Sequence, residues 1–119
     1  MAIIATSETV TLDALDEEVI YGPEMSMSDT DALIVQAFTA TTSTWTITFY
    51  GSVDGVNYVT FSVTPFSGSF GNNFSASGTS YSNIFTAGHS NIPYIKVKMT
   101  SYTGGNVTLK AVSRRVFTR

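Results

Sequence analysis

The strongest fold signal lies in residues 44–63, which read TWTITFYGSVDGVNYVTFSV. Apolar and polar residues alternate on both sides of an Asp-Gly pair, which is the period of strands that are buried on one face. The stretch predicts a β-hairpin with both apolar rows on the same side, because a slip of one residue would turn one row into water. That register places Phe49 opposite Val59, Ile47 opposite Phe61 and Trp45 opposite Val63. Residues 53–55 then form a three-residue loop, in which Gly55 occupies the position that needs a positive φ.

A second pair of alternating segments lies near the end of the chain, at residues 92–102 and 107–117. Matching their apolar rows across Gly104-Gly105 predicts another hairpin with a three-residue turn, at residues 103–105 or 104–106. In that hairpin Lys98 falls near Lys110. Two like charges on one face cost on the order of a few tenths of a kcal/mol or more, unless an acidic side chain lies between them.

Shorter strand signals complete the pattern. Residues 2–12 and 19–21 alternate, and residues 31–40 are apolar on both faces, which indicates a central strand. Residues 64–91 are rich in glycine, serine and aromatic residues, and we expect one or two short strands there, around 70–75 and 81–85. The chain of 119 residues is therefore predicted to be a single all-β domain over residues 1–119, an antiparallel β-sandwich or jelly roll of about eight strands.

The charges of the chain are separated into two blocks. All nine acidic residues lie within residues 8–54, and all six basic residues lie from residue 96 onward. Two interpretations stay open and are compatible. The first and last strands meet within one domain and neutralise each other, or the acidic end of one copy meets the basic end of another copy or of a different protein.

The elements YGSVDGVNY (50–58), YIKVK (94–98) and YTGGNVTL (102–109) together resemble small β-sandwich proteins and domains of bacteriophage virions. These proteins are capsid decoration proteins, head fibres, and neck or tail components. The resemblance implies a non-enzymatic structural role without choosing among these components, with other virion proteins of the capsid, connector or tail as partners. Our main hypothesis among them is capsid decoration. It implies a location in the virion, after assembly in the host cytoplasm. We also expect a homo-oligomer.

The candidate contact residues fall into three groups. An arginine-rich end forms an electrostatic anchor, its carboxylate acceptors lie in the first acidic turn, and the uncharged segment supplies aromatic contacts. The anchor consists of Arg114, Arg115 and Arg119, the acceptors are Glu17 and Glu18, and the contact aromatics are Phe70, Phe74 and Phe85.

No motif in the sequence indicates a catalytic residue, a cofactor or a metal. The acidic run at residues 13–18 lacks the glycine with which a calcium loop wraps its ion, so we interpret it as a solvated turn. The single histidine, His89, has no nucleophile motif around it, and we expect it at the surface or in a subunit contact. A net charge of −3 argues against direct nucleic-acid binding, and the apolar start at residues 1–5 is too short to span a membrane.

One alternative function belongs to a different class. The aromatic residues of the segment 66–85 would also suit a carbohydrate-binding module, in a phage adsorption apparatus or in a free lectin-like domain. Tyr81 and Phe85 would then stack on sugar rings. Covering the core, binding a protein and binding a glycan all stay open for this segment at the level of sequence.

Overall fold

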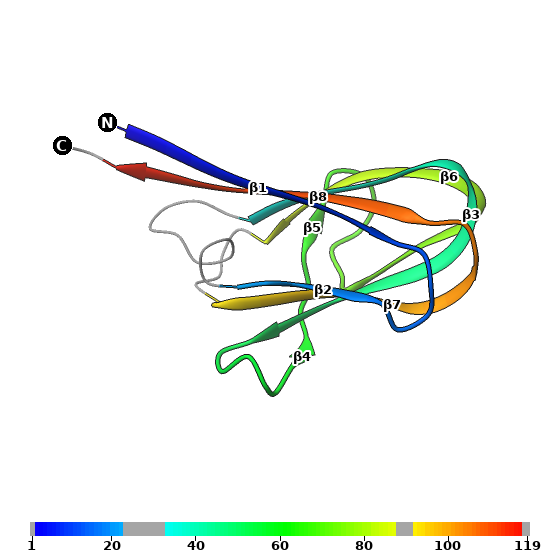
Figure 1. Cartoon of the computed structure of the whole chain (residues 1–119), viewed down its shortest axis with the longest axis horizontal. Coiled ribbons are helices and arrows are strands. Elements are labelled where there is room, and N and C mark those ends of the chain that lie inside the picture. Colours follow the sequence, from blue (N-terminus) through cyan, green and yellow to red (C-terminus); the bar gives the residue numbers. More distant parts are fainter. Residues whose placement is uncertain (1, 23–32, 88–91, 118–119) are drawn as a thin grey trace.

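A computed structural model describes residues 2–22, 33–87 and 92–117, with the side chains of residues 2–7, 40 and 113–117 left aside (Figure 1). Within these residues the chain forms eight strands and no helix. The strands are β1 (Ala2–Leu12), β2 (Glu18–Tyr21), β3 (Leu33–Ser52), β4 (Val59–Thr60), β5 (Thr64–Pro65), β6 (Asn73–Ala87), β7 (Tyr94–Gly104) and β8 (Val107–Phe117). Every pairing between them is antiparallel, so the predicted fold class is confirmed.

The eight strands form one sheet that folds over onto itself. The first layer runs β1-β8-β3-β6-β5 and uses the first half of β3 with the second half of β6. In the second layer β7 lies between β2 and the second half of β3. The other edge of that half of β3 pairs with the first half of β6 and with β4. The strands β3 and β6 therefore belong to both layers, and they curve from one to the other at the right of Figure 1.

The bend in β3 coincides with irregular pairing. The register between β3 and β6 shifts between Thr39 and Ser43 and again between Ser43 and Thr44. Hydroxyl groups take over hydrogen bonding at this corner, where the Ser43 and Thr39 side chains contact each other and the backbone of Thr41. A bulge bends a strand and locally disrupts its ladder of hydrogen bonds, and here the hydroxyl groups supply bonds in its place. The sheet can thus turn back on itself without ending β3.

The core fills the space between the two layers. The predicted inward rows are buried, including Leu33, Val35 and Ala37 in the first layer and Trp45, Ile47 and Phe49 in the second. Central position is also confirmed for β3, which has paired strands on both sides in each layer. Alternation along the sequence correctly predicts which side of these strands faces the core.

The register predicted for the first hairpin is wrong. Only Tyr50↔Thr60 and Gly51↔Val59 pair between β3 and β4, so that Phe49 lies opposite Phe61, whose N–H donates to the Phe49 carbonyl at 2.9 Å. The neighbour of Trp45 on this side is Ala76 of β6. Val59, expected inside, is 70% exposed. The shift arises because the loop is longer than three residues and satisfies its own N–H groups with side chains, although Gly55 has the predicted positive φ of 73°.

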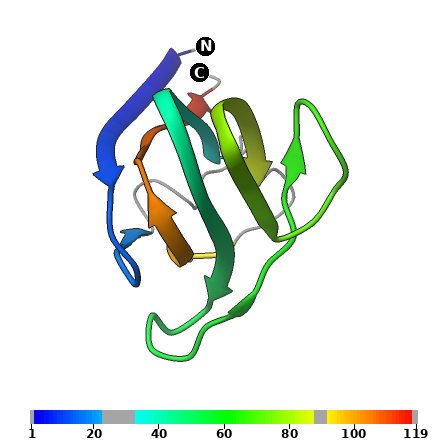
Figure 2. The ribbon, with the colours of Figure 1, turned by 90° about the vertical axis from the view of Figure 1, so that its right-hand side faces the viewer.

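The second predicted hairpin does not form. β7 pairs with β2 and β3, β8 pairs with β1 and β3, and the Gly104-Gly105-Asn106 segment carries the chain from one layer to the other beside the bend of β3 (Figure 2). Lys98 consequently lies opposite Glu18 on β2. Lys110 lies on β8, where it pairs with Thr9 and Gln36, so the two lysines are not neighbours across a strand pair. The two short strands expected near residues 70–75 and 81–85 are one continuous strand, β6.

Candidate protein-contact site

The loop that follows β5 presents two aromatic side chains to solvent. Phe66 is 88% exposed and Phe70 is 63% exposed. A Phe side chain in water forgoes about 1.5–3 kcal/mol of burial free energy, so such residues on a surface indicate a contact that the isolated chain does not make. We call residues 66–72 the aromatic loop.

Hydrogen bonds fix both ends of the aromatic loop. At its start, the Phe66 N–H donates to the Ile84 carbonyl at 2.7 Å, and the buried Asn83 amide binds the N–H and carbonyl of Ser67. At its end, Val63 and Gly71 exchange backbone hydrogen bonds of 2.8 and 3.2 Å. The exposed rings therefore stand on a backbone that the rest of the fold positions.

The other two predicted contact aromatics lie differently. Phe85 is 1% exposed and packs against Phe49 and Phe74, with ring centroids 5.1 and 4.4 Å away. The contact role predicted for Phe85 is therefore wrong, because its inward position on β6 makes it part of the core. Phe74 is half-buried and packs on the same cluster. Of the three predicted aromatics, Phe70 is the one that stands clear of the fold.

The residues suggested for glycan stacking are also occupied within the fold. Tyr81 is half-buried, its ring forms a T-shaped contact with Trp45 at a centroid distance of 5.1 Å, and burial raises the pKa of its phenol. Trp45 is itself buried, and its Nε1 donates to the Asn106 carbonyl at 2.9 Å. Phe85 lies in the core and cannot stack on a sugar, and Tyr81 is half-buried against Trp45.

The predicted acceptors, Glu17 and Glu18, already have contacts within the chain. Glu17 Oε1 accepts a hydrogen bond from the Asp13 backbone N–H at 2.7 Å, and this bond lowers the pKa of Glu17. A hydrogen bond between the two carboxyl groups and the negative charge of Glu17 raise the pKa of Asp13. Glu18 Oε1 lies 3.7 Å from Lys96 Nζ. Asp16 and Lys98 form a second ion pair of the same length. These pairs join the two charge blocks within one chain, as the first interpretation of those blocks predicts.

The arginine-rich end is described by its backbone alone. Arg114 pairs with Ala5 and Arg115 with Ile4, while Arg119 and also His89 lie outside the described residues. The acidic turn begins after Leu12, eight residues further along β1 than Ile4, which corresponds to about 27 Å of strand. The backbone of Arg114 and Arg115 therefore lies far along β1 from the turn that carries Glu17 and Glu18 of the same copy.

Sequence reasoning missed a second exposed apolar group, at the tip of the β3–β4 connection. Val53, Val56 and Val59, which we call the valine tip, are each at least 70% exposed. Next to them lies a depression of about 230 Å³, lined by Gly51, Ser52, Val53, Asn57, Val59, Phe61 and Ile92. The available signal was the pair of valines around Asp54-Gly55, since hairpin loops normally carry polar residues there.

A network around Asp54 keeps the valine tip in one conformation. The Asp54 carboxylate accepts hydrogen bonds from the N–H groups of Val56 and Asn57, each at 2.9 Å, and from the Ser52 hydroxyl at 2.8 Å. These bonds hold the pKa of Asp54 well below its ordinary value. The tip is thus a fixed apolar projection, and we count it with the aromatic loop as a candidate contact surface.

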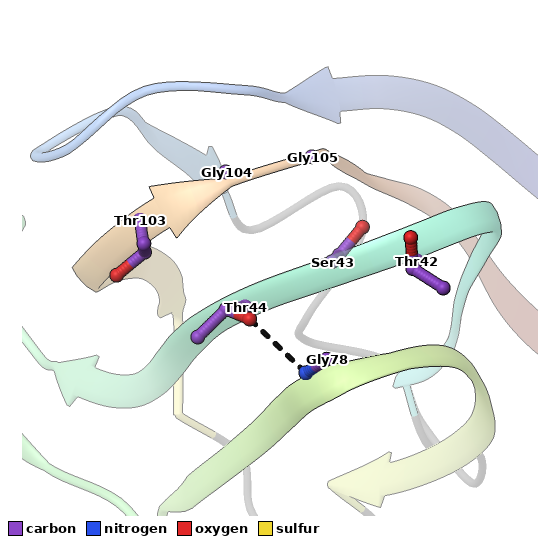
Figure 3. Close-up of a pocket in the computed structure, with 7 residues that line it drawn as sticks. All are labelled: Thr42, Ser43, Thr44, Gly78, Thr103, Gly104 and Gly105. Carbon is purple, nitrogen blue, oxygen red and sulfur yellow. Dashed lines mark hydrogen bonds between the residues drawn. The ribbon is translucent and has the colours of Figure 1, made fainter.

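The corner where the strands cross between layers contains a polar pocket of about 260 Å³ (Figure 3). Its lining consists of hydroxyl residues and glycines, namely Thr42, Ser43, Thr44, Gly78, Thr103, Gly104 and Gly105. The Gly78 N–H donates to Thr44 Oγ1 at 3.0 Å, as the dashed line in Figure 3 marks. Such a lining can hydrogen-bond a polar group, but it holds no carboxylate, imidazole or amine that could move a proton.

The geometry of this folded sheet can be compared with known structures. The fold is shared with a prophage-derived protein. That protein, the SPBc2 prophage-derived protein YomS, superposes with a TM-score of 0.68 over 96% of both chains at 18% sequence identity. A second structure, of Bacillus endospore appendages that form disulfide-linked pili, covers 96% of this chain and 89% of its own at 14% identity, with a TM-score of 0.47. No family model and no curated protein matches the sequence.

The described residues hold neither a metal-ligand cluster nor a membrane-spanning helix. Among residues 2–22, 33–87 and 92–117, no three His, Cys, Asp or Glu side chains are grouped so that they could hold a metal ion. The same residues contain no helix of the length and apolarity needed to cross a membrane. The exposed apolar groups of the aromatic loop and the valine tip therefore remain the strongest candidates for function.

Proposed function

We propose that this chain is a non-enzymatic structural protein of a bacteriophage virion, where it binds other virion proteins as a capsid decoration protein. The observation that carries the proposal is the pair of exposed phenylalanines, Phe66 and Phe70, on a loop whose ends are fixed by hydrogen bonds. The fold that the chain shares with a prophage-derived protein supports a phage role. The proposal assigns the chain to the assembled particle and gives it no reaction, cofactor or direct nucleic-acid contact.

A preformed loop suits this role because it lowers the cost of binding. Burying both rings against a neighbouring protein would gain about 1.5–3 kcal/mol each. A loop that is already ordered loses little conformational entropy on docking, so more of that gain appears as affinity. The valine tip, which is likewise held by side-chain hydrogen bonds, adds apolar area of the same kind.

Charge gives the proposed contact its orientation. Arg114 and Arg115 act as the anchor for carboxylates of a neighbouring protein, with Glu17 and Glu18 of another copy as acceptors in a homo-oligomer. The spacing of these groups along β1 and β8 favours a contact between copies, because they lie too far apart within one chain. Reversing both charges, with Arg114→Glu and Arg115→Glu, should lower incorporation into particles, and unchanged incorporation would rule out the anchor.

The direct test is incorporation into purified particles. A phage that lacks the gene is complemented with the tagged wild-type chain or with the double variant Phe66→Ser, Phe70→Ser, and the tag is quantified in purified particles. We expect the wild-type chain in the particles and at least a tenfold loss for the variant, since about 3 kcal/mol or more of contact is removed. Ser69→Ala in the same loop is the control and should incorporate normally. A wild-type chain that is absent from the particles would refute the proposal.

A further inference from the structure

The outer edge of β1 is a long row of backbone groups without a neighbouring strand among the described residues. β1 pairs with β8 alone, through eleven consecutive residues from Ala2↔Phe117 to Leu12↔Val107, with no register shift. Every second residue of such an edge strand directs its N–H and carbonyl away from the sheet. These groups form a regular template on which another extended strand can pair.

The other borders of the sheet are built differently. β2 has four residues, and β4 and β5 have two each, so none of them offers a long template. The outer edge of β6 is interrupted by the bend at Gly78, which has a φ of 70°. Short strands and bends are the means by which folded proteins prevent edge-to-edge association. β1 has neither, and in its eleven residues it contains no proline or lysine and one charge, Glu8.

The beginning of β1 is also short of support from the rest of the sheet. Pairing between β3 and β8 ends at Leu33↔Ser113, so residues 2–5 and 114–117 pair with each other and with no further described strand. Figure 1 shows this ribbon extending along the long axis beyond β3. Two strands alone are marginally stable in water, and a third strand supplies the missing hydrogen bonds.

We propose that the β1 edge binds the β1 edge of a second copy of this chain, antiparallel and around a two-fold axis. Identical strands are complementary to themselves in this arrangement, and the contact closes as a dimer. With Ser7 opposite Ser7, all eleven residues of both strands pair. Glu8 then lies directly opposite Thr6 of the second copy and diagonal to Glu8 of that copy, so the two like charges are not directly paired. This inference specifies the homo-oligomer of the proposed function and does not require the virion role.

The proposed register places Thr6 opposite Glu8 of the second copy, so substitutions of opposite charge at Thr6 should change the dimer Kd in opposite directions. Thr6→Glu would place two Glu–Glu pairs across the dimer, whereas Thr6→Lys would place two Lys–Glu pairs there. Sedimentation equilibrium of the purified chain over a range of concentrations gives the dimer Kd. We expect Thr6→Glu to raise the Kd about 2- to 30-fold and Thr6→Lys to lower it by a similar factor.

Matched variants separate this contact from net charge and from misfolding. Thr11→Glu and Thr11→Lys make the same charge changes at an exposed residue that faces Ile3 of the second copy in this register, so their Kd should change little. Combining Thr6→Glu with Glu8→Lys should restore dimerisation. Circular dichroism at dilute concentration checks that each variant keeps its strands.

Two results would overturn the inference. The first is a wild-type chain that stays monomeric up to millimolar concentration. The second is a dimer whose Kd responds equally to the Thr6 and Thr11 variants. A dimer that behaves as expected while the chain is absent from phage particles would leave the β1 contact in place and refute the virion role alone.

Discussion

Tyr21 illustrates a cost that the fold bears at a single residue. Its side chain is fully buried in the core, and its hydroxyl has no hydrogen-bond partner among the described residues. Burial, with a smaller effect from the charge of Glu8, raises the pKa of the phenol above its ordinary value. An unpaired buried hydroxyl lowers stability relative to an apolar side chain of the same shape.

We therefore expect Tyr21→Phe to raise the free energy of unfolding by about 1 kcal/mol at neutral pH. Because the pKa is higher in the folded state, the unfolded state releases the proton first, and wild-type stability falls as the pH rises past about 10. The variant should lose less in that range. Urea unfolding of the wild-type chain and of the Tyr21→Phe variant, at neutral pH and above about pH 10, measures the difference in stability. Tyr102→Phe is the control and should be destabilised, because the Tyr102 hydroxyl donates to the Gly105 carbonyl at 3.0 Å.

Gly105 and its neighbour Gly104 form a matched pair for a second experiment. Gly105 has a φ of 87°, and a Cβ there would collide with the Cβ and Oγ of Ser43, whereas a Cβ at Gly104 would meet nothing within 4 Å. Gly105→Ala should cost at least about 2 kcal/mol of unfolding free energy, from the backbone conformation and the collision together. Gly104→Ala should be nearly neutral. Similar thermal melts for both variants would contradict this account of the corner.

At the scale of whole strands, the sequence predicts orientation better than pairing. The alternating residues of β3 and β7 face the core as expected, because burial on one side requires a period of two. Alternation does not reveal whether two consecutive strands lie side by side or on opposite sides of a core. Residues 92–117 show the difference, since the same pattern fits a hairpin and the crossing between layers that is observed.

One signal in the sequence did argue against that hairpin. It would have set Lys98 beside Lys110, and the structure instead gives Lys98 an acidic neighbour in Asp16 at 3.7 Å. The contact site was also predictable only in part, because one predicted aromatic residue is exposed and another is buried. Phe70 and Phe85 look alike in sequence, but Phe85 falls on the inward row of β6, while Phe70 lies before the strand begins.

The connection between β3 and β4 allows a prediction about a loop. Asp54→Ala removes the acceptor for the N–H groups of Val56 and Asn57, so amide hydrogen exchange in residues 53–58 should become faster. Asp54→Asn keeps an acceptor oxygen and should exchange at an intermediate rate. Folding lowers the pKa of Asp54, so the ionised Asp54 carboxylate stabilises the folded state at pH values above its unfolded pKa of about 3.9. This stabilisation is lost as the pH falls through the lower pKa of the folded state. Unchanged exchange in Asp54→Ala would contradict the role given to this carboxylate.

For the molecule as a whole, the sharing of β3 and β6 between layers predicts cooperative unfolding. Neither layer can open without releasing strands that also belong to the other. Urea transitions followed by Trp45 fluorescence, which reports on the second layer, and by far-ultraviolet circular dichroism should therefore coincide. Separate midpoints would mean that the layers unfold independently.

The same sharing determines what happens if the backbone is cut at the valine tip. A break between Gly55 and Val56 leaves β1, β2 and β3 on one piece and β4 to β8 on the other. Of the seven strand pairings among the described residues, β5 with β6 is the single one that stays within a piece, and the other six join the two pieces. Each fragment alone therefore lacks almost all the strands with which its own strands pair. The two fragments together have the architecture of a split reporter, which assembles when two proteins fused to the fragments bring them together.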